Sequence, residues 1–174
     1  MATTELRDRL QPALLDRLTD RAPHQRLESE QDSVMTKAQL RQAVLRDLAW
    51  LFNATQPHPE WAGTMPPIAG TVLNFGLPPL AGQRVSRLDV HELEATIAQA
   101  IRTFEPRILA DTLAVRALEA SSVLDTHNTI EFEIRGHLWA QPVPLEILLR
   151  TRLDLEAGQV EVRDAAPSAP TRQE

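Results

Sequence analysis

An acid and a base flank a proline in the stretch RTFEPRIL, residues 102–109, where a helical pattern stops. Proline fixes its own φ and disfavours helix in the residue before it, here Glu105. Glu105 could act as a general acid opposite a second carboxylate, Asp111 or Glu131, as in glycoside hydrolysis. That role needs a carboxyl group kept protonated by an apolar, uncharged pocket, whereas the charge of Arg107 favours the ionised form. The spacing therefore argues against catalysis by Glu105.

No other group of residues in the sequence indicates a known chemistry. The five histidines show no paired spacing on one helix face, so we expect no metal site. The chain has no cysteine, which excludes disulfides, thiolate nucleophiles and cysteine-ligated zinc. The sequence contains neither a nucleophile elbow nor a glycine-rich phosphate loop. It therefore predicts no catalytic, cofactor-binding or metal-binding residue.

The composition is typical of one soluble domain. The chain has 174 residues, of which 43% are hydrophobic and 24% charged, so it can form a core but not a second full domain. Its net charge of -6 disfavours a bulk electrostatic attraction to nucleic acid. Charged residues interrupt the N-terminal apolar positions, which argues against a signal peptide, and no stretch approaches a membrane span. We expect an intracellular protein without a nucleic-acid partner or membrane insertion.

The elements that position the E-P-R stretch are three helices followed by strands. Leucines at helical spacing predict a short first helix, Thr36 and Gln39 form a capping box at the start of the second, and Asp89 and Glu92 give the third an acidic first turn. Residues 56–82 hold six of the 13 prolines, which predicts a long functional or disordered loop. Beyond Pro106 the apolar period becomes alternating, which indicates about four antiparallel strands.

These patterns predict an α+β fold in two layers, with N-terminal helices packed on an antiparallel sheet of about four strands. The expected organisation is a helical arm at 1–20, a linker at 21–35, an α+β domain at 36–163 and a disordered tail at 164–174. The narrow leucine stripe of the arm fits packing on its own domain or on a partner equally well.

Several stretches, taken in order, resemble a known family. They are LLDRL, LRQAVLRDLAWLFN, TVLNFGLPPLAG, IRTFEPRI and IEFEIRGHLWAQPVPLEILLRTRLDLEAGQVEV, which together span roughly residues 6–163. The set resembles the TssE subunit of bacterial type VI secretion baseplates, which belongs with the baseplate wedge proteins of contractile phage tails. Early phage work gave this family the label "lysozyme".

The resemblance implies a non-catalytic structural subunit in a cytoplasmic, membrane-docked baseplate. Its implied partners are the wedge subunits TssF and TssG, with TssK as a further candidate, and the sheath subunits TssB and TssC. The family's E-P-R motif, which meets the helical bundle of the wedge, corresponds here to Glu105, Pro106 and Arg107. The resemblance also implies that a free edge of the sheet receives strands from sheath subunits.

Two interpretations of the E-P-R stretch follow. In the first, Pro106 holds Glu105 and Arg107 on a rigid turn, where they recognise complementary charges on a partner. In the second, the two charged residues tie the turn to the body of the protein. Under the first interpretation Arg107 is an exposed side chain, and we expect Arg107→Ala to leave the fold intact.

Two alternative functions remain open from the sequence. A cell-wall hydrolase would have an activity on peptidoglycan that Glu105→Gln abolishes. A regulatory adaptor, for which the same fold is reused in a stress response, would bind one soluble regulator tightly and would not depend on baseplate subunits.

Overall fold

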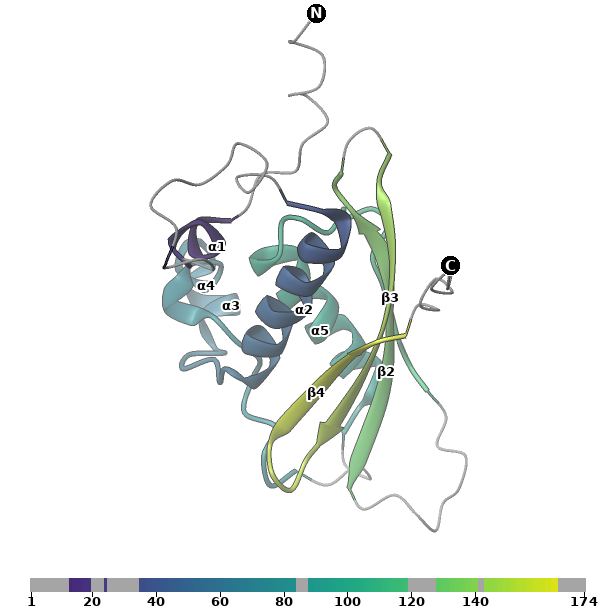
Figure 1. The fold of residues 1–174 in the computed structure, drawn as a ribbon. Helices are drawn as coiled ribbons and strands as arrows, with labels where there is room; N and C mark the ends of the chain where they lie inside the picture. Colours follow the sequence, from purple (N-terminus) through teal and green to yellow (C-terminus); the bar gives the residue numbers. More distant parts are fainter. Residues whose placement is uncertain are drawn as a thin grey trace, which may run out of the picture.

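The helices of this protein lie on one side of a single sheet, so the molecule has two layers (Figure 1). All neighbouring strands are antiparallel, in the order β1-β2-β3-β4. The predicted α+β class with four strands is confirmed. The computed structural model describes residues 13–19, 24, 35–83, 88–118, 128–140 and 143–165.

The two long helices begin at residues whose side chains cap them. The Thr36 side chain accepts the Gln39 N–H at 3.2 Å and the Gln39 side chain accepts the Thr36 N–H at 2.7 Å, which confirms the predicted capping box. Asp89 caps the last helix by accepting two backbone N–H groups. The elements are α1 (Leu14–Leu18), α2 (Lys37–Asn53), α3 (Trp61–Thr64), α4 (Pro66–Ala69), the 3-10 turn η2 (Val72–Asn74) and α5 (Val90–Phe104).

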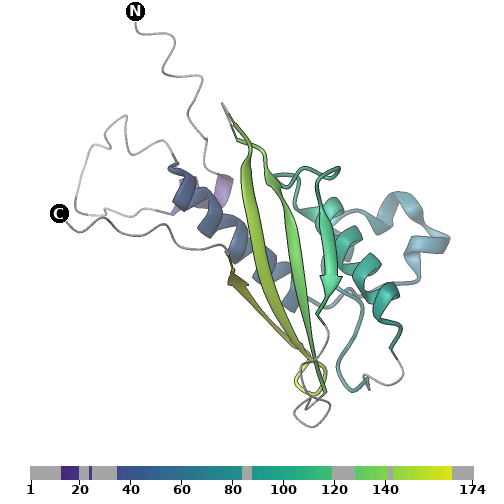
Figure 2. The same cartoon turned by 90° about the vertical axis from the view of Figure 1, so that its right-hand side faces the viewer.

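The sheet has one buried face and one solvent-facing face. Its strands are β1 (Ala114–Ala117), β2 (Thr129–Leu138), β3 (Leu145–Asp154) and β4 (Gln159–Asp164). Along β2 and β3, buried and more exposed residues alternate, as expected when only one face packs on helices. Arg150 and Arg152 lie among the exposed residues of β3, as ordinary solvent-face charges do. The two outer strands are β1, on the side of α5, and β4, on the side of α2 (Figure 2).

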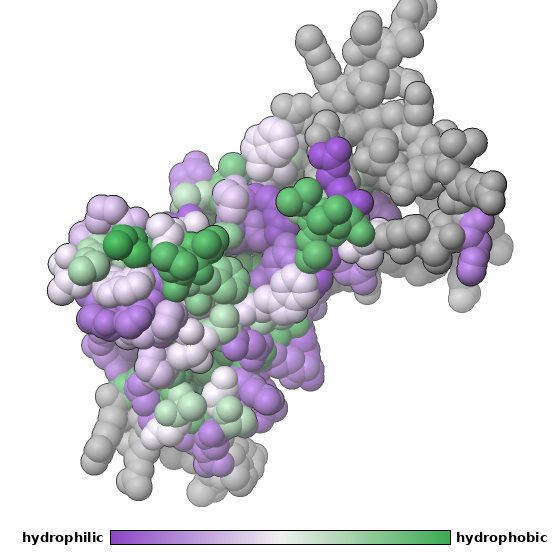
Figure 3. Space-filling view, turned by 90° about the vertical axis from the view of Figure 1, so that its left-hand side faces the viewer, coloured by the Kyte–Doolittle hydropathy of each residue, from purple (hydrophilic) through white to green (hydrophobic). Residues whose placement is uncertain are grey.

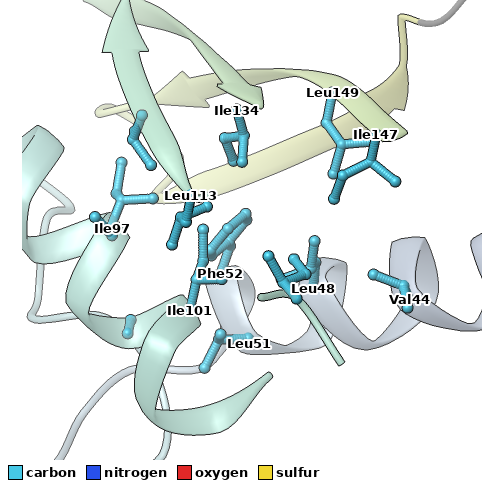
Figure 4. Close-up of a cluster of buried hydrophobic side chains, with 14 of the residues drawn as sticks. Val44, Leu48, Leu51, Phe52, Ile97, Ile101, Leu113, Ile134, Ile147 and Leu149 are labelled. Carbon is cyan, nitrogen blue, oxygen red and sulfur yellow. The ribbon is translucent and has the colours of Figure 1, made fainter. Parts of the chain in front are cut away.

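The hydrophobic core lies between α2, α5 and the inner face of the sheet (Figure 4). Leu48 of α2, Ile101 of α5 and Ile134 of β2 are among its fully buried side chains. Burying each such side chain contributes about 1.5–3 kcal/mol. Because α2 and α5 are both anchored by this core, the turn that follows α5 is held in a fixed position against α2.

The proline-rich loop at 56–82 is ordered in the structure and contains α3, α4 and η2. The Asn74 side chain, which is fully buried, accepts the His58 N–H at 3.1 Å and donates to the Ala69 carbonyl. Gly76 has φ +127, and a Cβ there would lie 2.3 Å from the Ala54 oxygen. The loop is therefore fixed to the end of α2.

Parts of the predicted arm, linker and tail lie outside the described residues. These include residues 1–12 of the predicted arm, most of the linker at 21–35 and the tail from residue 166. Met35, at the end of the predicted linker, is buried in the core. In the part of the chain that the structure describes, no helix has the length and hydropathy to cross a bilayer.

Candidate functional site

The E-P-R turn joins the end of α5 to the edge of β2. Glu105 follows the last residue of α5 and its N–H donates to the Ile101 carbonyl at 2.8 Å. Pro106 is exposed, and the Arg107 carbonyl accepts the Trp139 N–H at 2.7 Å, just beyond β2. The turn is thus bonded at both ends to regular structure, and its backbone is fixed.

Arg107 binds the Glu105 carboxylate within this turn. Glu105 Oε1 accepts the backbone N–H of Arg107 at 3.1 Å and its Nε at 2.7 Å, and Oε2 accepts Nη2. Glu105 is only 3% exposed. Its side chain does not project to solvent, and the contacts are those of the second interpretation, in which the charged pair ties the turn to the body.

A chain of alternating charges continues from Arg107 across the helical layer. Arg107 Nη2 donates to Asp47 of α2 at 2.6 Å, and Asp47 also accepts from its neighbour Arg46 at 2.8 Å. Arg46 reaches Asp16 of α1 at 2.6 Å. We call Asp16, Arg46, Asp47, Glu105 and Arg107 the charge network. It connects α1, α2 and the E-P-R turn.

The two arginines of the charge network stay ionised at any physiological pH. Burial alone would lower the pKa of Arg107, but hydrogen bonds and charge from Glu105 and Asp47 outweigh that effect and raise the pKa. The hydrogen bonds that Arg46 donates to Asp16 and, to a smaller extent, to Asp47 raise its pKa. The two charged guanidiniums therefore hold the three acidic side chains of the network in place, an arrangement that suits positioning.

The surroundings of Glu105 and the size of the hollows are relevant to the hydrolase interpretation, in which Glu105 acts as a general acid on a bound substrate. Glu105 is held by a permanent cation, and Asp111 and Glu131, the second acids considered, are exposed. A hollow of about 70 Å³, lined by residues that include Phe52, Pro78 and Val160, is far smaller than a typical ligand pocket of about 300–1,000 Å³. Within the described ranges, no three His, Cys, Asp or Glu residues are grouped to hold a metal ion.

Sequence reasoning did not identify Asp16, Arg46 and Asp47 as members of this site. Arg46 and Asp47 are adjacent in α2, but an acid–base pair in a helix is usually a solvated face. The signal that could have found them is Trp50, one turn further on, because Arg46 lies over its ring with the guanidinium carbon 5.2 Å from the ring centroid.

Exposed apolar side chains gather on the same side of the molecule as α1 and α4. Figure 3 shows two hydrophobic patches there, one over α1 and one over the region of α4 and η2, separated by more polar surface. In α1 the expected polarity is reversed: Leu14 is 72% exposed and Leu18 is 74% exposed, while the Asp16 side chain is 2% exposed. The exposed apolar residues in these elements are Leu14, Leu15, Leu18, Met65, Ile68, Val72 and Leu73.

Comparison with known proteins supplies a family for this arrangement. Residues 38–143, more than half of the chain, match the family model described as the baseplate wedge protein gp25. The matched region contains α2, the proline-rich loop, α5, the E-P-R turn, β1 and β2. No curated protein and no solved structure matches the chain.

Proposed function

Because the chain belongs to the family of the baseplate wedge protein gp25, we propose that it is the TssE-type subunit of a type VI secretion baseplate. The family membership makes it a phage-tail-like structural protein that assembles with other baseplate components. The finer role that we propose is to join the wedge complex to the contractile sheath and to template sheath assembly. The protein carries out no catalysis in this role.

The proposed partners fall into two groups. The E-P-R turn of Glu105, Pro106 and Arg107 is the contact with the helical bundle of the wedge, formed by TssF and TssG with TssK nearby. At the sheet, the sheath subunits TssB and TssC add strands by main-chain hydrogen bonding. Both contacts are made on the cytoplasmic side of a baseplate that is docked to the membrane.

The observation that carries the wedge contact is the position of Arg107. Its guanidinium is fixed between Glu105 and Asp47, yet 24% of its side chain stays exposed beside Pro106. A side chain ordered in the free protein loses little conformational freedom on binding. Glu105 affects partner binding by holding Arg107 in position, because its own carboxylate is buried. The contact is therefore proposed to be made by Pro106 and Arg107, with Glu105 as a positioning residue.

The exposed apolar residues on the same side of the molecule support a helical partner. Leu14 and Leu18 of α1 lie on the element that the charge network connects to the turn, through Asp16. Arginine is enriched at the energetically dominant centre of protein–protein interfaces, and exposed leucines add apolar area that a partner can bury. Helix faces pack on one another through such side chains.

The test is co-purification of the full chain with TssF and TssG. Arg107→Lys keeps the charge but cannot bind Glu105 and Asp47 with a planar fork, and we expect it to weaken wedge binding about tenfold. Arg150→Lys, on the solvent face of the sheet, is the matched control and leaves binding unchanged. Thermal unfolding of each variant shows that the chains compared are folded. Failure of the wild-type chain to bind TssF and TssG would contradict the proposed function.

A further inference from the structure

Each outer strand of the sheet presents alternate main-chain groups to the outside. In an antiparallel ladder, every second residue of an edge strand bonds its neighbour, and the residues between turn their N–H and C=O away. The Leu118 N–H donates to Glu131 of β2, so Val115 and Ala117 turn outward on β1. The Ala165 N–H donates to Leu148 of β3. By the same rule, Val160, Val162 and Asp164 turn outward on β4.

The edge of β4 is closed by α2. The Asn53 side chain accepts the Val160 N–H at 2.9 Å and donates to the Val160 carbonyl at 2.8 Å, which are the two bonds that a residue of an added strand would make. Arg41 holds the other end of β4 by a two-point contact with the Asp164 carboxylate. Only Val162 lies between these contacts. An incoming strand could pair at Val160 only by breaking the two bonds to Asn53, which its own main chain would merely replace.

Among the described residues, Glu94 alone covers the edge of β1. Glu94 of α5 accepts the Ala117 N–H at 2.7 Å through Oε1. A carboxylate can accept but cannot donate, so it leaves the Ala117 carbonyl without a donor of its own. No described residue bonds the outward N–H or C=O of Val115. This edge has unused donors and acceptors of the kind that an extended chain satisfies.

Glu94 has other partners to which it can move. Its second oxygen, Oε2, lies 3.2 Å from His91 Nδ1 and 3.9 Å from Arg116 Nη1. If a carbonyl of another chain takes the Ala117 N–H, the carboxylate remains beside these two groups and is not left isolated. A charged side chain placed at a strand edge also discourages unspecific pairing with other chains.

We propose that β1 is the edge at which an extended segment of a neighbouring subunit adds to this sheet, and that Glu94 is the gatekeeping residue which that segment displaces. The inference rests on the proposed function, in which sheath subunits supply the segment, and it specifies the edge and the gate. The β4 edge stays closed by Asn53 and Arg41 in the free and the assembled protein.

Two proline variants of the full chain test the choice of edge. Ala117→Pro and Val162→Pro each remove one outward N–H, from β1 and β4 respectively, and keep the ladder bonds to the inner strand. Each is mixed with TssF, TssG, TssB and TssC, and the sheath subunits retained on the wedge complex are measured. We expect Ala117→Pro to lower sheath retention by at least about tenfold and Val162→Pro to change it less than about twofold.

A second pair of variants tests the role of Glu94 and contains no proline substitution. Glu94→Ala removes the competing acceptor and is expected to raise sheath retention several-fold. Glu92→Ala, an exposed acid on the same helix, is the matched control and is expected to have no effect. Loss of retention in Val162→Pro with retention kept in Ala117→Pro would overturn the inference, as would equal behaviour of Glu94→Ala and wild type. A wild-type chain that does not bind TssF and TssG would overturn the proposed function itself.

Discussion

Arg107 Nη2 lies 2.6 Å from Asp47 Oδ2, although the two residues are 60 positions apart in the sequence. The contact fixes the turn after α5 to the middle of α2. Because Arg107 also binds Glu105, it neutralises a carboxylate that is almost wholly removed from solvent. Arg107 is therefore structural as well as a candidate for partner contact.

Replacing Arg107 by alanine is expected to destabilise the protein by about 3 kcal/mol, because it leaves the Glu105 carboxylate buried without its partner. This corrects the expectation from sequence that Arg107→Ala leaves the fold intact, which assumed an exposed arginine. Urea unfolding gives the free energy, with Arg102→Ala on the exposed face of α5 as the control. A decrease in the free energy of unfolding of less than about 0.5 kcal/mol would show that water replaces the guanidinium at Glu105.

Asn53→Ala is expected to lower the free energy of unfolding by about 1–2 kcal/mol, because both outward groups of Val160 lose their partner. Gln42→Ala, an exposed position on the same helix, is expected to stay within about 0.5 kcal/mol of wild type. Amide hydrogen exchange at Val160 should rise in Asn53→Ala only. Unchanged protection there would mean that the side-chain amide does not close the edge of β4.

Gly76→Ala is expected to lower the free energy of unfolding by about 2–4 kcal/mol, since alanine is strained at φ +127 and its Cβ would overlap the Ala54 carbonyl. Gly63→Ala, in the same loop with open space around the added methyl group, is the matched control. Thermal unfolding of the two variants measures the difference. Equal melting temperatures would indicate that the backbone at Gly76 relaxes freely.

Glu94 is expected to make the stability depend on pH in the acid range. The Ala117 N–H, followed by the effects of His91 and Arg116, outweighs partial burial and lowers the pKa of Glu94 below its ordinary 4.5. A group whose pKa is lower in the folded state stabilises the fold above its unfolded value, and this contribution is lost as the pH falls through the folded value. Between about pH 7 and pH 3, the melting temperature should therefore fall more steeply with decreasing pH in wild type than in Glu94→Gln. Parallel curves would contradict this assignment.

Local signals in the sequence were sufficient for most of the fold. The capping box at Thr36, the acidic start of α5 and the switch to alternating hydrophobicity after Pro106 depend on neighbouring residues, and the structure has each of them, with Asp89 as the cap of α5 and Glu92 in its first turn. The pairing of Arg107 with Asp47 has no local signal, because it arises only when the core brings α5 against α2. The other contacts of the charge network also form only when separate elements pack together, so the sequence did not predict them.

The arm shows the limit of pattern reading in a different way. A leucine stripe usually indicates the buried side of a helix, but α1 contacts Arg46 through Asp16 and turns Leu14 and Leu18 to solvent. A helix of five residues has too few turns for its own pattern to decide its orientation. Among the described residues, the ion pair between Asp16 and Arg46 of α2, 30 positions away, ties α1 to the body of the protein.

The two contacts that α2 makes with β4 also constrain the length of the helix. Arg41 and Asn53 are 12 positions apart, which is about 18 Å along a helix, and they bind the two ends of one strand. One residue inserted between them would turn Asn53 by about 100° around the helix axis and away from Val160. Substitutions on the exposed face of α2 are compatible with this arrangement, but insertions and deletions are not. In related proteins that keep both contacts, we therefore expect the number of residues between positions 41 and 53 to be constant, while the exposed residues between them vary.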